Sequence, residues 1–187
     1  MKRHLLWLGL VIASLTTVRA QTLRLGYYGE TVTHYGLRAA YERPFASYTK
    51  ERNAALKSFY LSLGIALYRH PQNHVGLIVS PEIGYRRTGR RGGLFELAVS
   101  PAFFRYFLDG QTYEPTESGD FRRVRLAGGQ AFMPTVSVGI GRDLSVRHRL
   151  PLSLYTRLNL MQQRPYNTSA LMRFGIEFGT LIPLKKS

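Results

Sequence analysis

Apolar and polar residues alternate with a period of two along most of this chain. Every odd position from Phe59 to Leu67 carries a bulky apolar side chain, and the even positions between them carry Tyr, Ser, Gly and Ala. An amphipathic helix would instead repeat its apolar residues at spacings of three and four. The pattern therefore predicts a β-strand with one apolar face and one face of small or polar side chains.

The same alternation recurs in seven further segments. They cover residues 23–28, 35–42, 75–86, 95–103, 132–141, 150–160 and 172–179. Turn-rich or charged sequences separate the segments, at residues 29–31, 44–53, 71–73, 88–92, 109–129, 142–149 and 164–167. About eight strands in this order predict an all-β, up-and-down antiparallel sheet.

The composition of the polar face indicates what surrounds this sheet. A soluble sheet normally presents Lys, Glu, Asp and Thr to water, whereas this face carries Gly, Ser, Ala and Tyr with a sparse set of Arg and Glu. The charged residues on it are Arg24, Arg38, Glu42, Glu82, Arg86, Glu96, Arg157, Arg173 and Glu177. Near-balanced charge on one face is typical of a confined interior, where each ion needs a partner.

We therefore predict a closed transmembrane β-barrel that turns its apolar face to lipid and holds a charge network in its lumen. Closure satisfies every backbone hydrogen bond, as hydrocarbon requires. An interior of eight strands has room only for side chains, so we expect no open pore. A soluble periplasmic lipid-binding barrel, with its apolar face inward, remains an alternative.

The first 20 residues have the features of an export signal. Lys2 and Arg3 are followed by an uncharged apolar run over residues 5–15, and Val18 and Ala20 supply small residues before Gln21. The apolar run is shorter than the roughly 20 residues that a transmembrane helix needs. We expect residues 1–20 to be removed as a signal peptide, leaving residues 21–187 as a barrel domain of the outer membrane.

Charge and cysteine content narrow the remaining classes of function. The formal net charge of +15 would suit a nucleic-acid-binding protein, but export argues against nucleic acid as a partner. The chain contains no cysteine, which excludes disulfides, cysteine-ligated metals, a thiol nucleophile and a lipoprotein anchor. We predict no cofactor.

Residues 22–183 resemble the small eight-stranded outer-membrane barrels of the OmpA/OmpX-like kind, in pattern rather than in any specific motif. The resemblance implies insertion by the barrel-assembly machinery, outer-membrane lipids and lipopolysaccharide as surroundings, and both termini in the periplasm. Because successive strands cross the membrane in opposite directions, connections alternate between its two sides. Counting from a periplasmic N-terminus puts the long connection 109–129 outside the cell and the turn 88–92 in the periplasm. Phe174, Ile176 and Phe178 match the alternating last strand of such barrels, but the chain continues to Ser187 instead of ending on Phe.

Candidate chemistry is sparse. His70 and His74 flank a tight turn and would suit a surface metal pair, but a polar turn explains them more simply, so we predict no metal site. His34 falls on the polar face and lacks a His-x-Ser spacing. We therefore assign no catalytic residue and predict that the protein is not an enzyme.

Two classes of function are compatible with these patterns. The first is a structural or surface-interaction role through the outer loops. In it, Arg122, Arg123 and Arg125 contact lipopolysaccharide phosphates, unless they simply form a solvated loop. The alternative is a membrane-embedded hydrolase or acyltransferase that modifies lipid A, for which the sequence supplies no recognisable site.

Overall fold

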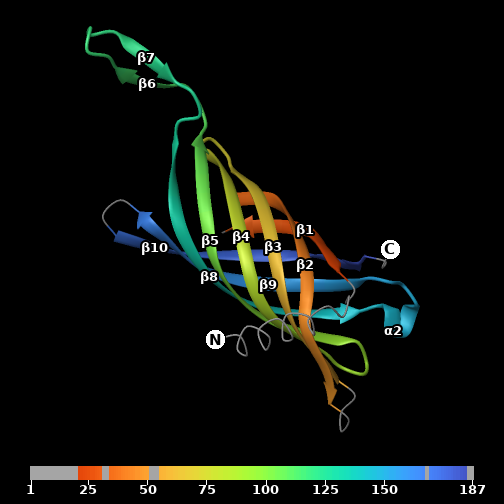
Figure 1. Cartoon of the computed structure of the whole chain (residues 1–187). Helices are drawn as coiled ribbons and strands as arrows, with labels where there is room; N and C mark the ends of the chain where they lie inside the picture. The colour runs from red at the N-terminus through yellow and green to blue at the C-terminus, as the bar shows by residue number, and fades with distance from the viewer. Residues whose placement is uncertain (1–20, 31–33, 51–54, 167–168, 185–187) are drawn as a thin grey trace, which may run out of the picture.

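A computed structural model describes residues 21–30, 34–50, 55–166 and 169–184. The eight barrel strands are β1 (Thr22–Glu30), β2 (His34–Lys50), β3 (Ala55–His70), β4 (His74–Thr88), β5 (Gly93–Leu108), β8 (Gly128–Asp143), β9 (Ser153–Tyr166) and β10 (Ser169–Pro183). They close into one ring in the order β1-β10-β9-β8-β5-β4-β3-β2, and every neighbouring pair is antiparallel (Figure 1). The predicted closed, up-and-down barrel is confirmed, whereas the predicted signal peptide lies outside the described residues.

The face that points outward is the apolar one. Large apolar side chains stand exposed around the ring, including Leu37 on β2, which is 72% exposed, Ile140 on β8 and Phe174 on β10. The residues between them, of which Arg24 and Glu177 are examples, are buried in the lumen. No helix in the described part of the chain is long and apolar enough to cross a membrane.

Strand β2 is longer than the sequence pattern predicts. The pattern predicts a connection over residues 44–53, but β2 continues through Pro44 to Lys50 and pairs with β3 over that length. The register between the two strands shifts between Pro44 and Ala46. A bulge of this kind accommodates a proline, which lacks the N–H that a regular ladder needs.

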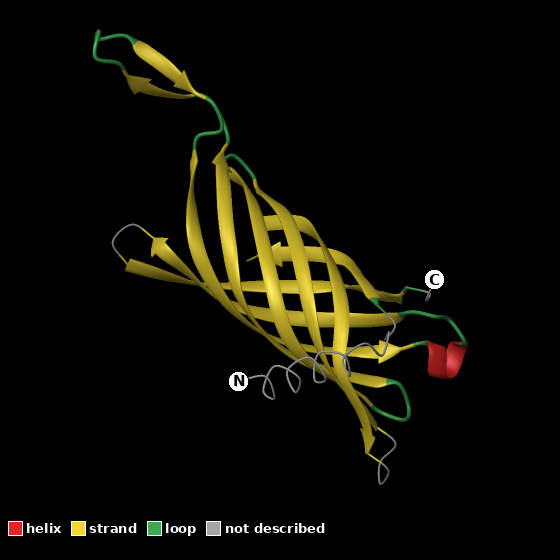
Figure 2. Cartoon of the chain, in the orientation of Figure 1, coloured by secondary structure: helices red, strands yellow, loops and turns green. Residues whose placement is uncertain are grey.

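Two connections contain secondary structure that the pattern does not reveal. The long connection after β5 forms its own two-stranded sheet, β6 (Thr112–Pro115) and β7 (Phe121–Val124), which extends away from the barrel (Figure 1). The connection after β8 contains the one short helix of the described residues, α2 (Ser145–His148), drawn red in Figure 2. Strand β9 begins only at Ser153, three residues later than predicted.

Inside the barrel, tyrosine rings lie flat against glycines of the neighbouring strand. A Cβ atom added at Gly84 would come within 2.3 Å of the Tyr60 ring, and one at Gly76 would come equally close to the ring of Tyr68. Only a residue without a side chain leaves room for this approach. The small residues of the polar face thus allow large rings to fill a narrow lumen.

Candidate functional site

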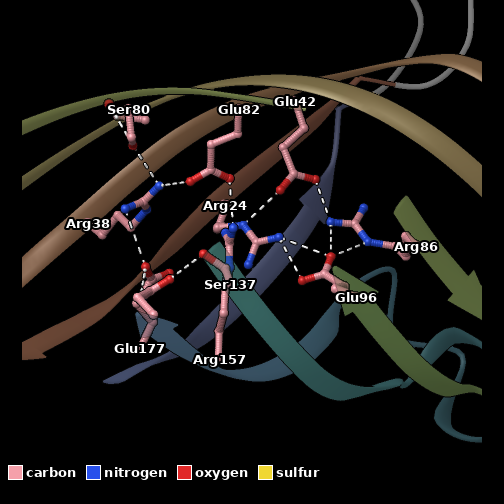
Figure 3. A network of polar contacts seen from close by, with 12 residues as sticks. Arg24, Arg38, Glu42, Ser80, Glu82, Arg86, Glu96, Ser137, Arg157 and Glu177 are labelled. Atoms are coloured by element: carbon pink, nitrogen blue, oxygen red, sulfur yellow. Dashed lines mark hydrogen bonds and ion pairs between the residues drawn. The ribbon is translucent and has the colours of Figure 1, made fainter. Parts of the chain in front are cut away.

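The two ends of the barrel are distinguished by the segments they carry. At the terminal end, β1 begins at Thr22 and β10 ends at Pro183. At the hairpin end lie the tight turn 71–73 and the β6–β7 sheet. Eight charged residues between these ends form what we call the lumen network: Arg24, Arg38, Arg86 and Arg157 with Glu42, Glu82, Glu96 and Glu177 (Figure 3).

Four residues on four strands form a closed ring of ion pairs in the terminal half of the lumen. Arg24 Nε donates to Glu42 Oε1 over 2.7 Å, and Arg24 Nη2 donates to Glu96 Oε2 over 2.9 Å. Arg86 Nη2 pairs with Glu42 Oε2 over 2.6 Å and also pairs with Glu96. Each carboxylate therefore pairs with both guanidinium groups, and the two negative and two positive charges of the ring balance (Figure 3).

The other four residues form a second group of ion pairs within the lumen network. Glu82 accepts from Arg38 and, over 2.9 Å, from Arg157 Nη2. Arg38 Nη1 also lies 3.3 Å from Glu177 Oε1, which accepts a hydrogen bond of 2.7 Å from Asn159. The lumen network joins β2, β4, β9 and β10 in this way.

Charge and burial explain why these residues must interlock. Arg24 is fully buried and Glu96 is 1% exposed, so neither side chain has access to bulk water. A buried ion without a partner costs several kcal/mol, whereas four positive and four negative groups in contact compensate one another. Tyr155 and Tyr60 add ring faces 4.3 Å and 4.8 Å from the guanidinium carbons of Arg24 and Arg86.

Arg173 lies apart from the lumen network, although the sequence places it on the same face. Its guanidinium pairs with Glu30 and donates to Gln163 Oε1 over 2.8 Å and to the Tyr68 hydroxyl over 2.5 Å. A layer of apolar side chains, including Ala66 and Met133, occupies the lumen as a separate buried cluster. The sequence pattern assigns Glu30 to a turn and so misses it, yet continuing the alternation by one step from Tyr28 would find it.

Three histidines meet at the mouth of the hairpin end. The ring centroids of His34 and His70 are 4.0 Å apart, and those of His70 and His74 are 5.2 Å apart. They line a cavity of about 650 Å³ together with Glu30 and Arg173. The alternating pattern does not predict that His34 meets the other two histidines. The strand register brings them together: Tyr35 pairs with Arg69, which puts His34 beside His70, and His70 pairs with His74.

One histidine of this mouth, His74, is partly buried and contacts a tyrosine. His74 Nε2 lies 3.3 Å from the Tyr68 hydroxyl. His74 is the first residue of β4 and directly follows the tight turn 71–73, so it lies at the very end of its strand. Burial, with help from His70 and Arg173, lowers the pKa of His74 to about 4. Within the described residues, no group of three or more His, Asp or Glu is arranged to hold a metal ion.

The predicted phosphate-contacting arginines lie on the β6–β7 sheet and its continuation. Arg122 Nη2 pairs with Glu114 Oε1 over 2.6 Å, and both side chains are exposed. Arg123 and Arg125 are exposed as well. Since an exposed pair of this kind is held weakly, all three guanidinium groups are accessible to an external anion.

Comparisons with known proteins give remote similarities only. No protein-family model matches the chain, and no curated protein matches it. Among solved structures, the outer membrane enzyme PagL is similar over 87% of this chain and 99% of its own, with 11% identity and a TM-score of 0.48.

Two autotransporter domains are also similar. The β domain of the Bordetella autotransporter BrkA has 12% identity and a TM-score of 0.36, covering 86% of this chain and 68% of its own. The translocator domain of NalP from Neisseria meningitidis has 11% identity and a TM-score of 0.28, covering 98% and 95%. These similarities assign no activity to this chain.

Proposed function

We propose that this protein is an integral outer-membrane β-barrel with a closed polar lumen and a structural or surface-interaction role. The observation that carries the proposal is the inverted distribution of side chains: large apolar residues such as Leu37 stand outside, while the lumen network is buried inside. In water, an apolar surface around the whole barrel would drive association. In hydrocarbon the same surface is the stable arrangement.

The closed lumen is supported by the lumen network and by the apolar layer. The network spans strands on opposite sides of the ring, because Arg24 on β1 reaches Glu96 on β5. An ion moving through would have to separate buried pairs, which costs several kcal/mol. We therefore propose that the lumen network holds the strands together and that the barrel does not conduct solutes.

The surface-interaction role is supported by the β6–β7 sheet. It extends beyond the barrel and presents Arg122, Arg123 and Arg125 beside the exposed aromatic Phe121. Guanidinium groups bind phosphate oxygens through paired hydrogen bonds. In this proposal the sheet lies outside the cell, where lipopolysaccharide phosphates would be its partners, and the barrel-assembly machinery inserts the barrel.

Membrane fractionation followed by gel electrophoresis tests the outer-membrane proposal. We expect the protein to stay with the outer membrane through high-salt washing, to need detergent for extraction, and to migrate differently before and after heating. A mature chain that is monodisperse in buffer without detergent would refute the proposal and favour the soluble lipid-binding barrel.

Lipid A analysis tests the non-enzymatic part of the proposal. Mass spectrometry of lipid A from cells with and without the protein should give the same acyl composition. A species that lacks or gains an acyl chain only when the protein is present would replace our proposal with the hydrolase or acyltransferase alternative.

A further inference from the structure

Arginines gather at the terminal end of the barrel without matching acids. The segments 87–92 and 142–149 together contain six arginines and a single acid, Asp143. The Asp143 carboxylate accepts a hydrogen bond of 2.9 Å from the backbone N–H of Ser145, within its own turn. In the lumen network, by contrast, every arginine pairs with a glutamate. These two segments therefore carry an excess of positive charge.

A backbone hydrogen bond holds the two segments together. The N–H of Asp143, the last residue of β8, donates to the Gly92 carbonyl over 2.7 Å. Gly92 has a φ of 81°, and a Cβ atom added to it would lie 2.6 Å from the Asp143 carbonyl oxygen. Only glycine permits both this backbone conformation and this approach. The turn between β4 and β5 thus lies against the connection that contains α2 (Figure 2).

Four arginines line a pocket of about 580 Å³ where the two segments meet. Its lining comes from the turn, from β8 and from α2: Arg90, Arg91, Arg142, Val146 and Arg147. We call this the arginine pocket. Within the described part of the chain, none of its guanidinium groups takes part in an ion pair or a side-chain hydrogen bond. Like charges around one space repel one another, and an anion between them removes that repulsion.

The arginine pocket lies at the border of the apolar outer wall. The outward row of β8 is apolar from Phe132 to Ile140, and Gln130 and Arg142 flank it. A tilted strand needs about 9–11 residues to cross hydrocarbon, so this row accounts for the crossing and Arg142 falls at the level of the headgroups. Gly93, which begins β5 directly after the turn, pairs with Arg142 and so places the turn at the same level.

We propose that the arginine pocket binds the phosphate of an anionic phospholipid whose acyl chains lie along the outward row of β8. Guanidinium groups bind phosphate oxygens through paired, charge-assisted hydrogen bonds. The lipid also supplies the apolar partner, because Ile140, which is 64% exposed, comes next to Arg142 in that row. The proposal rests on the outer-membrane function above, since only in a membrane do headgroups surround this end of the barrel.

Native mass spectrometry of the barrel, extracted from membranes in mild detergent, tests the arginine pocket. We expect the extracted barrel to retain a bound anionic phospholipid, which repeated washing with detergent removes. The washed barrel is then titrated with phosphatidylglycerol, with phosphatidylcholine of the same acyl chains, and with inorganic phosphate. Phosphatidylglycerol should bind most tightly, because it combines a net negative charge with acyl chains. Since the barrel as extracted already holds its phospholipid, lipopolysaccharide added to it meets the β6–β7 sheet instead.

Two matched double variants separate the arginine pocket from net charge. Arg90→Gln/Arg147→Gln removes two lining arginines, and Arg69→Gln/Arg164→Gln removes two exposed arginines at the hairpin end. The first should bind phosphatidylglycerol about 25-fold more weakly, at about fivefold for each arginine near an anionic headgroup, and the second should bind it as the unchanged protein does. Gly92→Ala keeps every charge but pushes the two segments apart, so it should also weaken binding.

Equal weakening by the two double variants would overturn the proposal, because net charge would then hold the lipid. Inorganic phosphate that binds as tightly as phosphatidylglycerol would overturn it too, since the ligand would then be free phosphate. Equal affinity for the two phospholipids would show that the pocket does not select an anionic lipid. Heat-modifiable migration keeps these results separate from the outer-membrane proposal: a barrel that keeps the shift but shows no arginine-dependent binding refutes only the arginine pocket. A protein that needs no detergent refutes both.

Discussion

The two halves of the lumen come from the same alternating strands but fill the interior differently. In the terminal half, Glu42 and Glu96 each hold two guanidinium groups, and no net charge is left over within the lumen network. At the hairpin end, Arg173 pairs with Glu30 beside three imidazoles and a cavity of about 650 Å³. Interlocked ion pairs are therefore concentrated in the terminal half, and a cavity lined by histidines lies in the other.

The largest effect should follow from removing one carboxylate charge in the terminal half. Glu96→Gln keeps the shape of the side chain but leaves Arg24 and Arg86 to share Glu42. A broken buried pair costs about 3–5 kcal/mol of unfolding free energy. Urea unfolding in lipid vesicles measures this cost.

Glu114→Gln is the matched control, because Glu114 pairs with Arg122 at an exposed position of the β6–β7 sheet. That variant should change the unfolding free energy by about 0–1 kcal/mol. Equal effects of the two substitutions would show that the lumen network contributes no more than a solvated surface pair.

A second effect should come from the contact between tyrosine and glycine in the terminal half. The Cβ atom of Gly84→Ala would lie 2.3 Å from the Tyr60 ring, which also covers the guanidinium of Arg86. Overpacking of this kind costs about 1–3 kcal/mol. Gly93→Ala, with no atom within 4 Å of the added Cβ, should cost less, and Tyr60→Ala should relieve most of the Gly84→Ala penalty. An unrelieved penalty would contradict the assigned contact.

The hairpin end should respond to pH where the terminal half does not. The pKa of His74 is lowered from 6.5 to about 4, so between these values the unfolded chain binds a proton that the folded barrel does not. Stability should therefore decrease as pH falls from about 6.5 to 4 and change little through this group above 6.5. Unfolding of His74→Gln across the same range should show a weaker dependence. If the stability of His74→Gln depends on pH as strongly as that of the unchanged protein, a group other than His74 is responsible for the dependence.

Sequence alone predicts the parts of this molecule that depend on alternation. It identifies the barrel, the outward apolar face and the inward position of Arg24 or Glu82, because a period of two determines the side of the sheet on which a residue falls. It does not give register, since many strand offsets preserve the same faces. The meeting of His34 with His70 is a consequence of register and is visible only in the structure.

Local chemistry explains the remaining differences between prediction and structure. Pro44 suggests the end of a strand, but the shift in register next to it lets β2 continue. The segment 109–129 resembles an irregular loop, because strands as short as Thr112–Pro115 contain too few residues to show a period. Glu30 falls in a predicted turn because it is the last position of β1, where a single further step of alternation is easily taken for the start of the connection.

The smallest effect on stability, and the clearest on binding, should come from the exposed arginines. Replacing Arg122, Arg123 and Arg125 together with Gln should leave the unfolding free energy within about 1 kcal/mol, because these side chains are exposed. Binding of purified lipopolysaccharide to the detergent-extracted barrel should weaken, and its dependence on salt should become shallower, because fewer guanidinium groups meet phosphate. Replacing Arg90, Arg91 and Arg147 removes the same charge at the terminal end, near α2, and should leave that binding unchanged. If both triple variants weaken binding equally, net charge rather than the β6–β7 sheet attracts the lipid.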